Sequence, residues 1–171
     1  DTRFRRAFAN TALFALMVVP VQTLAALLLA LWVNRPEAAW RWLRLVVFVP
    51  TVVAMPALAI LWTMMYQPAQ GNEMGLVNWA LAAFGVEPRA WLVDPALALP
   101  AIAFMSVWQG VGLQMMIFLA GLQTLSREVL EAARLDGANA LQRTLFITLP
   151  ALRNTLAFAV SVTTILAFRI F

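Results

Sequence analysis

The sequence predicts an all-α integral membrane protein, a polytopic helical bundle with four spans, and three observations lead to this prediction. Hydrophobic residues make up 63% of the 171 residues and charged residues only 12%, whereas a soluble domain is roughly 45–50% apolar and about 25% charged. The apolar residues gather in long runs, and the arginines lie at the ends of those runs. Because much of a small domain's surface must face its solvent, this composition requires lipid as that solvent.

Four apolar runs are the candidate spans, at residues 8–33, 43–66, 96–120 and 151–171. Each of the first three has the ~20 residues that a helix needs to cross ~30 Å of hydrocarbon. Lipid tolerates no unpaired backbone groups, so we expect a helix for all four runs. Pro50 and Pro56 lie within the second run and predict a bend there, which gives the span its shape or serves as a gating hinge.

All four runs belong to one predicted transmembrane domain over residues 1–171. The sequence begins without Met and stops inside an apolar run. We therefore expect it to be an excerpt of a longer protein, incomplete at both ends.

The connections between the runs differ in charge. Basic residues flank the first and third connections, whereas residues 67–95 have a net acidic set. The positive-inside rule therefore predicts that the first and third connections are cytoplasmic and that residues 67–95 form an outer loop. The alternation of spans requires the same arrangement. The basic residues are Arg35, Arg41 and Arg44, then Arg127, Arg134, Arg143 and Arg153; the acidic set is Glu73, Glu87 and Asp94 against Arg89.

The outer loop also contains a short amphipathic pattern. Its apolar residues are Leu76, Val77, Trp79, Leu81 and Phe84. Amphipathic segments of this kind lie in the membrane interface, so the pattern predicts a short element on the membrane surface.

The composition excludes several kinds of chemistry within these residues. The chain has no Cys, no His and no Lys, so it offers no disulfide, no thiolate or imidazole metal ligand and no P-loop lysine. Ser106 and Ser161 have no His or Lys to act as a base, which argues against an intramembrane enzyme. The arginines form no dense basic run, so we expect no nucleic-acid partner. We predict no catalytic residue, no metal site and no cofactor bound by this chain.

The polar segment at residues 122–149, between the third and fourth runs, predicts a helical hairpin on the cytoplasmic face. Ser126 is a candidate N-cap, and the first helix is expected to end near Asp136, with Gly137 in a left-handed conformation. A second helix restarts near Ala138 or Asn139, and Pro150 marks the break before the last span. Spacing alone leaves open whether the hairpin folds back on the membrane face or docks to a partner. The apolar stripe of the second helix consists of Leu141, Leu145 and Leu149, with Phe146 beside it.

The order of residues in this segment, EAARLDGANALQRTLFITLP, resembles the EAA loop of the membrane subunits of binding-protein-dependent ABC importers. The Asp-Gly-Ala variant is similar to that of the carbohydrate-type permeases, the maltose and glycerol-3-phosphate importer class. Weaker similarities cover most of the remaining chain, up to the penultimate span of the usual permease domain. The matching residues are Glu131, Ala132, Ala133, Asp136, Gly137, Ala138, Phe146, Ile147, Leu149 and Pro150.

This resemblance implies a non-catalytic permease subunit of an ATP-driven importer of a sugar or sugar-like solute, in the bacterial inner membrane. The implied partners are a cytoplasmic ABC ATPase dimer, which carries ATP and Mg²⁺, a second permease subunit and an extracytoplasmic solute-binding protein. An importer of peptides or amino acids with the same architecture, and an uncoupled channel or scaffold, are the alternatives. The implied ATPase-coupling residues are Glu131, Ala132, Ala133, Asp136, Gly137, Ala138 and Phe146.

The third run carries the candidate substrate contacts Trp108, Gln109 and Gln114. Amides are costly in hydrocarbon unless they are partnered, and amides with aromatic faces suit a sugar. The alternative is that they make interhelical hydrogen bonds, beside close packing through Gly110 and Gly112. Because Gln109 and Gln114 are five residues apart, we expect at most one of them to face a pathway. Gln22 and Thr63 are weaker candidates.

Overall fold

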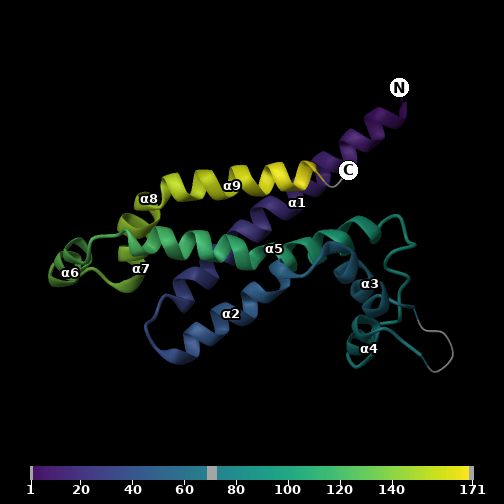
Figure 1. The fold of residues 1–171 in the computed structure, drawn as a ribbon, viewed down its shortest axis with the longest axis horizontal. Helices are drawn as coiled ribbons and strands as arrows, with labels where there is room; N and C mark the ends of the chain where they lie inside the picture. Colours follow the sequence, from purple (N-terminus) through teal and green to yellow (C-terminus); the bar gives the residue numbers. More distant parts are fainter. Residues whose placement is uncertain (1, 69–72, 170–171) are drawn as a thin grey trace.

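The computed structural model describes residues 2–68 and 73–169, which form a bundle of long helices with two smaller helical units attached (Figure 1). One unit lies between the second and third predicted spans, and the other lies between the third and fourth. The helices are α1 (Thr2–Val33), α2 (Ala38–Val52), α3 (Met55–Met65), α4 (Leu76–Ala82), α5 (Ala98–Gln123), α6 (Arg127–Leu135), α7 (Ala140–Arg143), the π-helix η1 (Thr144–Thr148), α8 (Leu149–Ala151) and α9 (Arg153–Phe168).

Helix α5 is the centre of the bundle, because α1, α2 and α9 all pack against it. Glycines on α5 permit two of these close approaches. A Cβ on Gly112 would collide with the backbone carbonyl of Val47 on α2, and a Cβ on Gly121 would lie 2.7 Å from Oγ1 of Thr155 on α9. Small residues at such positions let helix backbones approach in membranes, where packing rather than the hydrophobic effect drives helix association.

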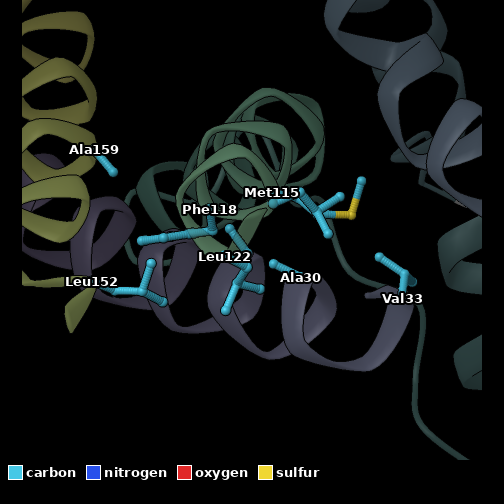
Figure 2. Packing of buried hydrophobic residues seen from close by; sticks show 9 residues of the cluster. Ala30, Val33, Met115, Phe118, Leu122, Leu152 and Ala159 are labelled. Atoms are coloured by element: carbon cyan, nitrogen blue, oxygen red, sulfur yellow. The ribbon is translucent and has the colours of Figure 1, made fainter. Parts of the chain in front are cut away.

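The main apolar core lies where α1, α5 and the start of α9 meet. Figure 2 shows Phe118 and Leu122 of α5 in this core with Ala30 of α1 and Leu152, the residue between α8 and α9. Phe118 is fully buried, and Leu152 is nearly so. The polar segment after α5 is therefore packed into the core at both of its ends, through Leu122 and Leu152.

The second predicted span, residues 43–66, is not one continuous helix. The structure has α2 and α3 bent by 100° at a break of two residues. Val53 and Ala54 at the break are extended, with ψ of 135° and 134°. Pro56 lies in the first turn of α3, where its missing N–H costs no hydrogen bond. The bend expected from the prolines is thus a complete interruption of the helix.

The other helices differ from the predicted runs mainly at their ends. Helix α1 begins at Thr2, six residues before the first run, and α5 spans Ala98–Gln123 in place of residues 96–120. Among the described residues, α1 and α5 are long and apolar enough to cross a membrane, and the number rises to four if each bent pair is one span. Residues 69–72 of the predicted outer loop and residues 170–171 of the fourth run lie outside the described residues.

The C-terminus of α1 is capped by a side chain from α2. Arg44 donates from Nε and Nη2 to the carbonyl of Val33, at 3.1 and 2.5 Å, and from Nη2 to the carbonyl of Arg35 at 2.7 Å. A cation at this position satisfies the last carbonyls of the helix and opposes its dipole. The short α1–α2 connection is therefore a fixed turn.

Candidate functional site

The first half of the polar segment folds as the sequence predicts. Ser126 caps α6, with Oγ accepting a hydrogen bond from the Val129 N–H at 3.5 Å. The helix ends in a Schellman motif, in which Ala138 N–H donates to the Ala133 carbonyl at 2.9 Å and Gly137 N–H to the Arg134 carbonyl at 3.1 Å. Gly137 has φ of +82°, so the left-handed glycine is confirmed.

The second half begins with a capping box and is longer than the sequence predicts. Asn139 Oδ1 accepts from the Gln142 N–H at 2.9 Å, and Gln142 Oε1 accepts from the Asn139 N–H at 2.8 Å. The helix then passes through the π-turn η1 and α8 before a bend of 67° into α9. The predicted break at Pro150 therefore falls at Leu152, because a proline in the first turn of a helix is tolerated.

We call residues 127–151 the α6–α8 hairpin. Most of its predicted coupling residues are exposed: Glu131, Ala132, Asp136, Gly137 and Phe146 face outward, Ala138 is half-buried and only Ala133 is buried. Large apolar side chains accompany them, with Leu135 90% and Phe146 75% exposed. Asp136, Gly137, Ala138 and Phe146 also line one shallow pocket on the hairpin. An exposed apolar surface edged by charges is typical of a protein interaction site.

A cavity of about 360 Å³ lies inside the helical bundle, and we call it the central cavity. Its volume is within the ~300–1,000 Å³ of typical small-molecule sites. On α5 its wall runs from Ser106 to Ile117, about 12 Å from the start of the helix and about 9 Å from its end at ~1.5 Å per residue. It is lined by Phe14, Val18 and Gln22 of α1, Thr51 and Met55, Ser106, Gln109, Gly110, Leu113, Gln114 and Ile117 of α5, and Val162, Thr163, Leu166, Ala167 and Arg169.

Two buried oxygen atoms at the central cavity have no hydrogen-bond partner among the described residues. These are Ser106 Oγ and Gln114 Oε1. Gln114 is only 2% exposed, and its Nε2 donates to Thr23 Oγ1 at 2.9 Å, which orients the amide. Unsatisfied buried oxygens are costly, and a ligand hydroxyl that donates to them would remove that cost.

The structure brings two of the three predicted pathway residues together. Gln109 and Gln114 both line the central cavity, whereas the sequence predicted that at most one of them would face a pathway. The cavity extends around α5 toward both α1 and α2, and residues on two faces can therefore reach it. Trp108 is not in the lining; it packs edge-on against Trp62, with ring centroids 5.5 Å apart.

Other polar residues, including the weaker candidate Gln22, also line the central cavity. Gln22 lies against Gly110, where a Cβ would be 2.6 Å from Gln22 Nε2, whereas the equally ranked Thr63 bonds its own helix at the Ile60 carbonyl. Thr51, Ser106 and Thr163 were missed as lining residues. A hydroxyl within an apolar run was the only available signal, and such groups often bond their own helix, as Thr163 does to the Ala159 carbonyl at 2.9 Å.

Comparison with known proteins covers nearly all of the chain. The lactose transport system permease protein LacF of Rhizobium radiobacter is 34% identical over 174 residues, which cover 100% of this chain and 57% of LacF. The trehalose/maltose transport system permease protein MalF of Thermococcus litoralis is 35% identical over 161 residues, 94% of this chain and 53% of MalF. The chain thus spans a little over half the length of these curated relatives.

The fold is also that of a solved ABC importer. The crystal structure of a bacterial ABC transporter that imports the acidic polysaccharide alginate superposes with a TM-score of 0.87 at 23% identity, covering 99% of this chain and 59% of that one. The family model described as the binding-protein-dependent transport system inner membrane component matches residues 3–171. The chain therefore belongs to this family of membrane permease components.

Proposed function

We propose that this chain forms half of the translocation pathway of an ATP-driven importer of a sugar or sugar-like solute. The main observation in support is the central cavity, in which amide and hydroxyl groups face a largely apolar space in the middle of the bundle. Ser106 Oγ and Gln114 Oε1 accept from solute hydroxyls, and the apolar wall contacts the C–H faces of a sugar ring. The sugars named in the lactose and trehalose/maltose relatives support this class of solute.

The α6–α8 hairpin, in this proposal, docks to a cytoplasmic ABC ATPase dimer, which binds and hydrolyses ATP with Mg²⁺. Glu131 pairs with a basic or polar group of the ATPase, and Leu135 and Phe146 supply the apolar contact. The core around Leu152 and Leu122 ties the hairpin to α9 and α5, and both helices also line the central cavity. A motion of the docked hairpin therefore reaches the solute site through packed helices.

The proposal includes two further partners. A second permease subunit completes the pathway, and an extracytoplasmic solute-binding protein delivers the solute from outside. A complex of the alginate transporter with its alginate-loaded periplasmic protein supports this last partner. The subunit is multi-pass in the bacterial inner membrane, with the α1–α2 turn and the hairpin in the cytoplasm, as the flanking arginines indicate.

The docking role is tested by replacing Phe146 with Ala in the full-length subunit. Because Phe146 is mostly exposed, the variant is expected to insert normally and to lose most of the co-purifying ATPase. Phe84→Ala is the matched control, since Phe84 is 85% exposed in the predicted outer loop. Normal ATPase recovery with Phe146→Ala would contradict the docking role.

The solute class is tested separately in the reconstituted transporter. A panel of binding proteins loaded with sugars, amino acids or peptides is added, and ATP hydrolysis is measured. Stimulation by sugar-loaded proteins alone is the expected result, and stimulation by the amino-acid or peptide set alone would overturn the assignment.

A further inference from the structure

In the described part of the predicted outer loop, one buried amide holds together the segments on either side of α4. Asn78 of α4 is fully buried. Its Nδ2 donates to the carbonyls of Gln67 and Arg89 at 2.9 and 3.0 Å, and its Oδ1 accepts from the Arg89 N–H at 3.0 Å and from Trp91 Nε1 at 2.8 Å. Both donors and both lone pairs of the amide are used. These bonds fix α4 to the chain at Gln67 before it and at Arg89 and Trp91 after it.

The opposite face of α4 is apolar and uncovered. Leu76 and Trp79 are about two-thirds exposed, and Phe84, two residues beyond the helix, is 85% exposed. On the inner side, Val77 packs against the cluster of Leu58, Trp62 and Tyr66. The amphipathic pattern of this loop thus forms a helix. One side of the helix packs against the rest of the protein, and the other side contacts no other part of the described structure.

Charged residues are nearly absent around this face. Between Arg44 and Glu87 the only charged residue is Glu73, whereas about a quarter of the residues in an ordinary soluble domain are charged. Helix α3, which packs on α4, adds the exposed side chains of Ile60, Leu61 and Met64. Charges return directly after α4, at Glu87, Arg89 and Asp94. The loop therefore has an apolar layer next to a charged layer, the order found at a membrane boundary.

We propose that the outward face of α4, together with Phe84, lies in the interfacial layer of the lipid bilayer, with Trp79 at the level of the headgroups. The face continues the exposed apolar surface of α3. The Trp79 indole N–H has no hydrogen bond to another described residue, and in the interface lipid ester or phosphate oxygens accept it. The helix thereby fixes the depth of the loop in the membrane. The assignment of α4 to the outer leaflet rests on the proposed orientation of the chain, whereas its contact with lipid does not depend on that orientation.

The test uses the full-length protein without other cysteines, reconstituted in nanodiscs of phosphatidylglycerol and phosphatidylethanolamine. Leu76→Cys and Phe84→Cys are labelled with a small environment-sensitive fluorophore. Glu87→Cys, an exposed position in the same loop, is the matched control. Quenching is measured with aqueous iodide and, separately, with a nitroxide-headgroup lipid.

The expected result is severalfold less iodide quenching and severalfold more nitroxide-lipid quenching at Leu76 and Phe84 than at Glu87. Equal iodide quenching at all three positions would place this face in water and overturn the proposal. Protection from iodide without lipid quenching would show that protein covers the face, which overturns it equally. Because neither solute nor ATPase enters the measurement, its failure is distinct from failure of the proposed transport function.

Discussion

The α6–α8 hairpin and the central cavity are built in opposite ways. In the hairpin, the cap, turn and capping-box bonds join residues at most five apart, as from Ala138 to Ala133 or Gln142 to Asn139. The cavity instead joins α1, α2, α3, α5 and α9, and one of its bonds connects Gln114 to Thr23. The protein thus separates a locally encoded hairpin from a cavity that exists only after the bundle has packed.

The largest expected effect comes from straining the turn of the hairpin. Gly137→Val places a β-branched residue at φ of +82°, and left-handed geometry costs an L-residue roughly 1–2 kcal/mol. We expect the turn to relieve this strain by changing the angle between α6 and α7, so that the hairpin no longer fits the proposed ATPase partner. We expect normal membrane insertion with nearly complete loss of solute-stimulated ATP hydrolysis, measured in the reconstituted transporter.

Gly85→Val is the matched control for this strain. Gly85 has φ of +77°, and a Cβ at either glycine would meet no atom within 4 Å. The two variants therefore carry similar backbone strain, one in the hairpin and one in the predicted outer loop. If Gly137→Val and Gly85→Val lost solute-stimulated ATP hydrolysis equally, backbone strain at either site would inactivate the protein. That result would contradict a specific coupling role of the hairpin.

The next largest effects are expected from two glycine variants of α5, one that disturbs helix packing and one that disturbs the central cavity. Gly112→Ala drives a methyl group into the backbone of Val47 and Phe48, which cannot move aside. Overpacking of this kind costs about 1–3 kcal/mol, so we expect a lower Tm in detergent. For Gly110→Ala, the three atoms nearest to the added Cβ all belong to the side chain of Gln22, which can rotate into the cavity. We expect an unchanged Tm and a raised KM for solute uptake; equal Tm losses would contradict this distinction.

These pairs also show what the sequence could predict. Ser126 and Gly137 act through bonds to near neighbours, so the cap and the turn of the hairpin follow from residue order. The position of a lining residue such as Gln22 depends on how α1 packs on α5, and a single apolar run does not encode that geometry. The break at Val53 and Ala54 could not be predicted for the same reason. Pro50 and Pro56 indicate that the helix bends, but they do not give the angle of the bend.

A smaller effect is expected from removing one acceptor in the central cavity. Gln114→Leu deletes the unpartnered Oε1 and the bond to Thr23 while keeping the volume of the side chain. An unmade hydrogen bond to a buried group costs about 1–3 kcal/mol, which corresponds to a KM raised roughly 5- to 150-fold. ATPase recovery and basal hydrolysis are expected to stay unchanged, because the hairpin is intact.

Ser161→Ala is the control for this cavity variant. Ser161 is exposed on α9, bonds the Ala157 carbonyl at 2.8 Å and does not line the cavity. Its uptake kinetics should match those of the unaltered protein. A normal KM for Gln114→Leu would remove the cavity from the pathway, whatever the hairpin variants show.

The smallest effect compares the two caps of the hairpin. Asn139→Ala removes the 2.9 Å bond from the Gln142 N–H to Asn139 Oδ1 and keeps the backbone N–H that donates to Gln142 Oε1. Losing a cap of this kind costs about 0.5–2 kcal/mol. Ser126→Ala removes one longer bond of 3.5 Å at the start of α6, so its cost should lie at the lower end. Amide hydrogen exchange is expected to rise in residues 140–148 for Asn139→Ala and less in residues 127–135 for Ser126→Ala. Equal exchange increases would mean that α7 and α8 are held by α9 rather than by their own cap, and the hairpin would then be less locally encoded than its bonds indicate.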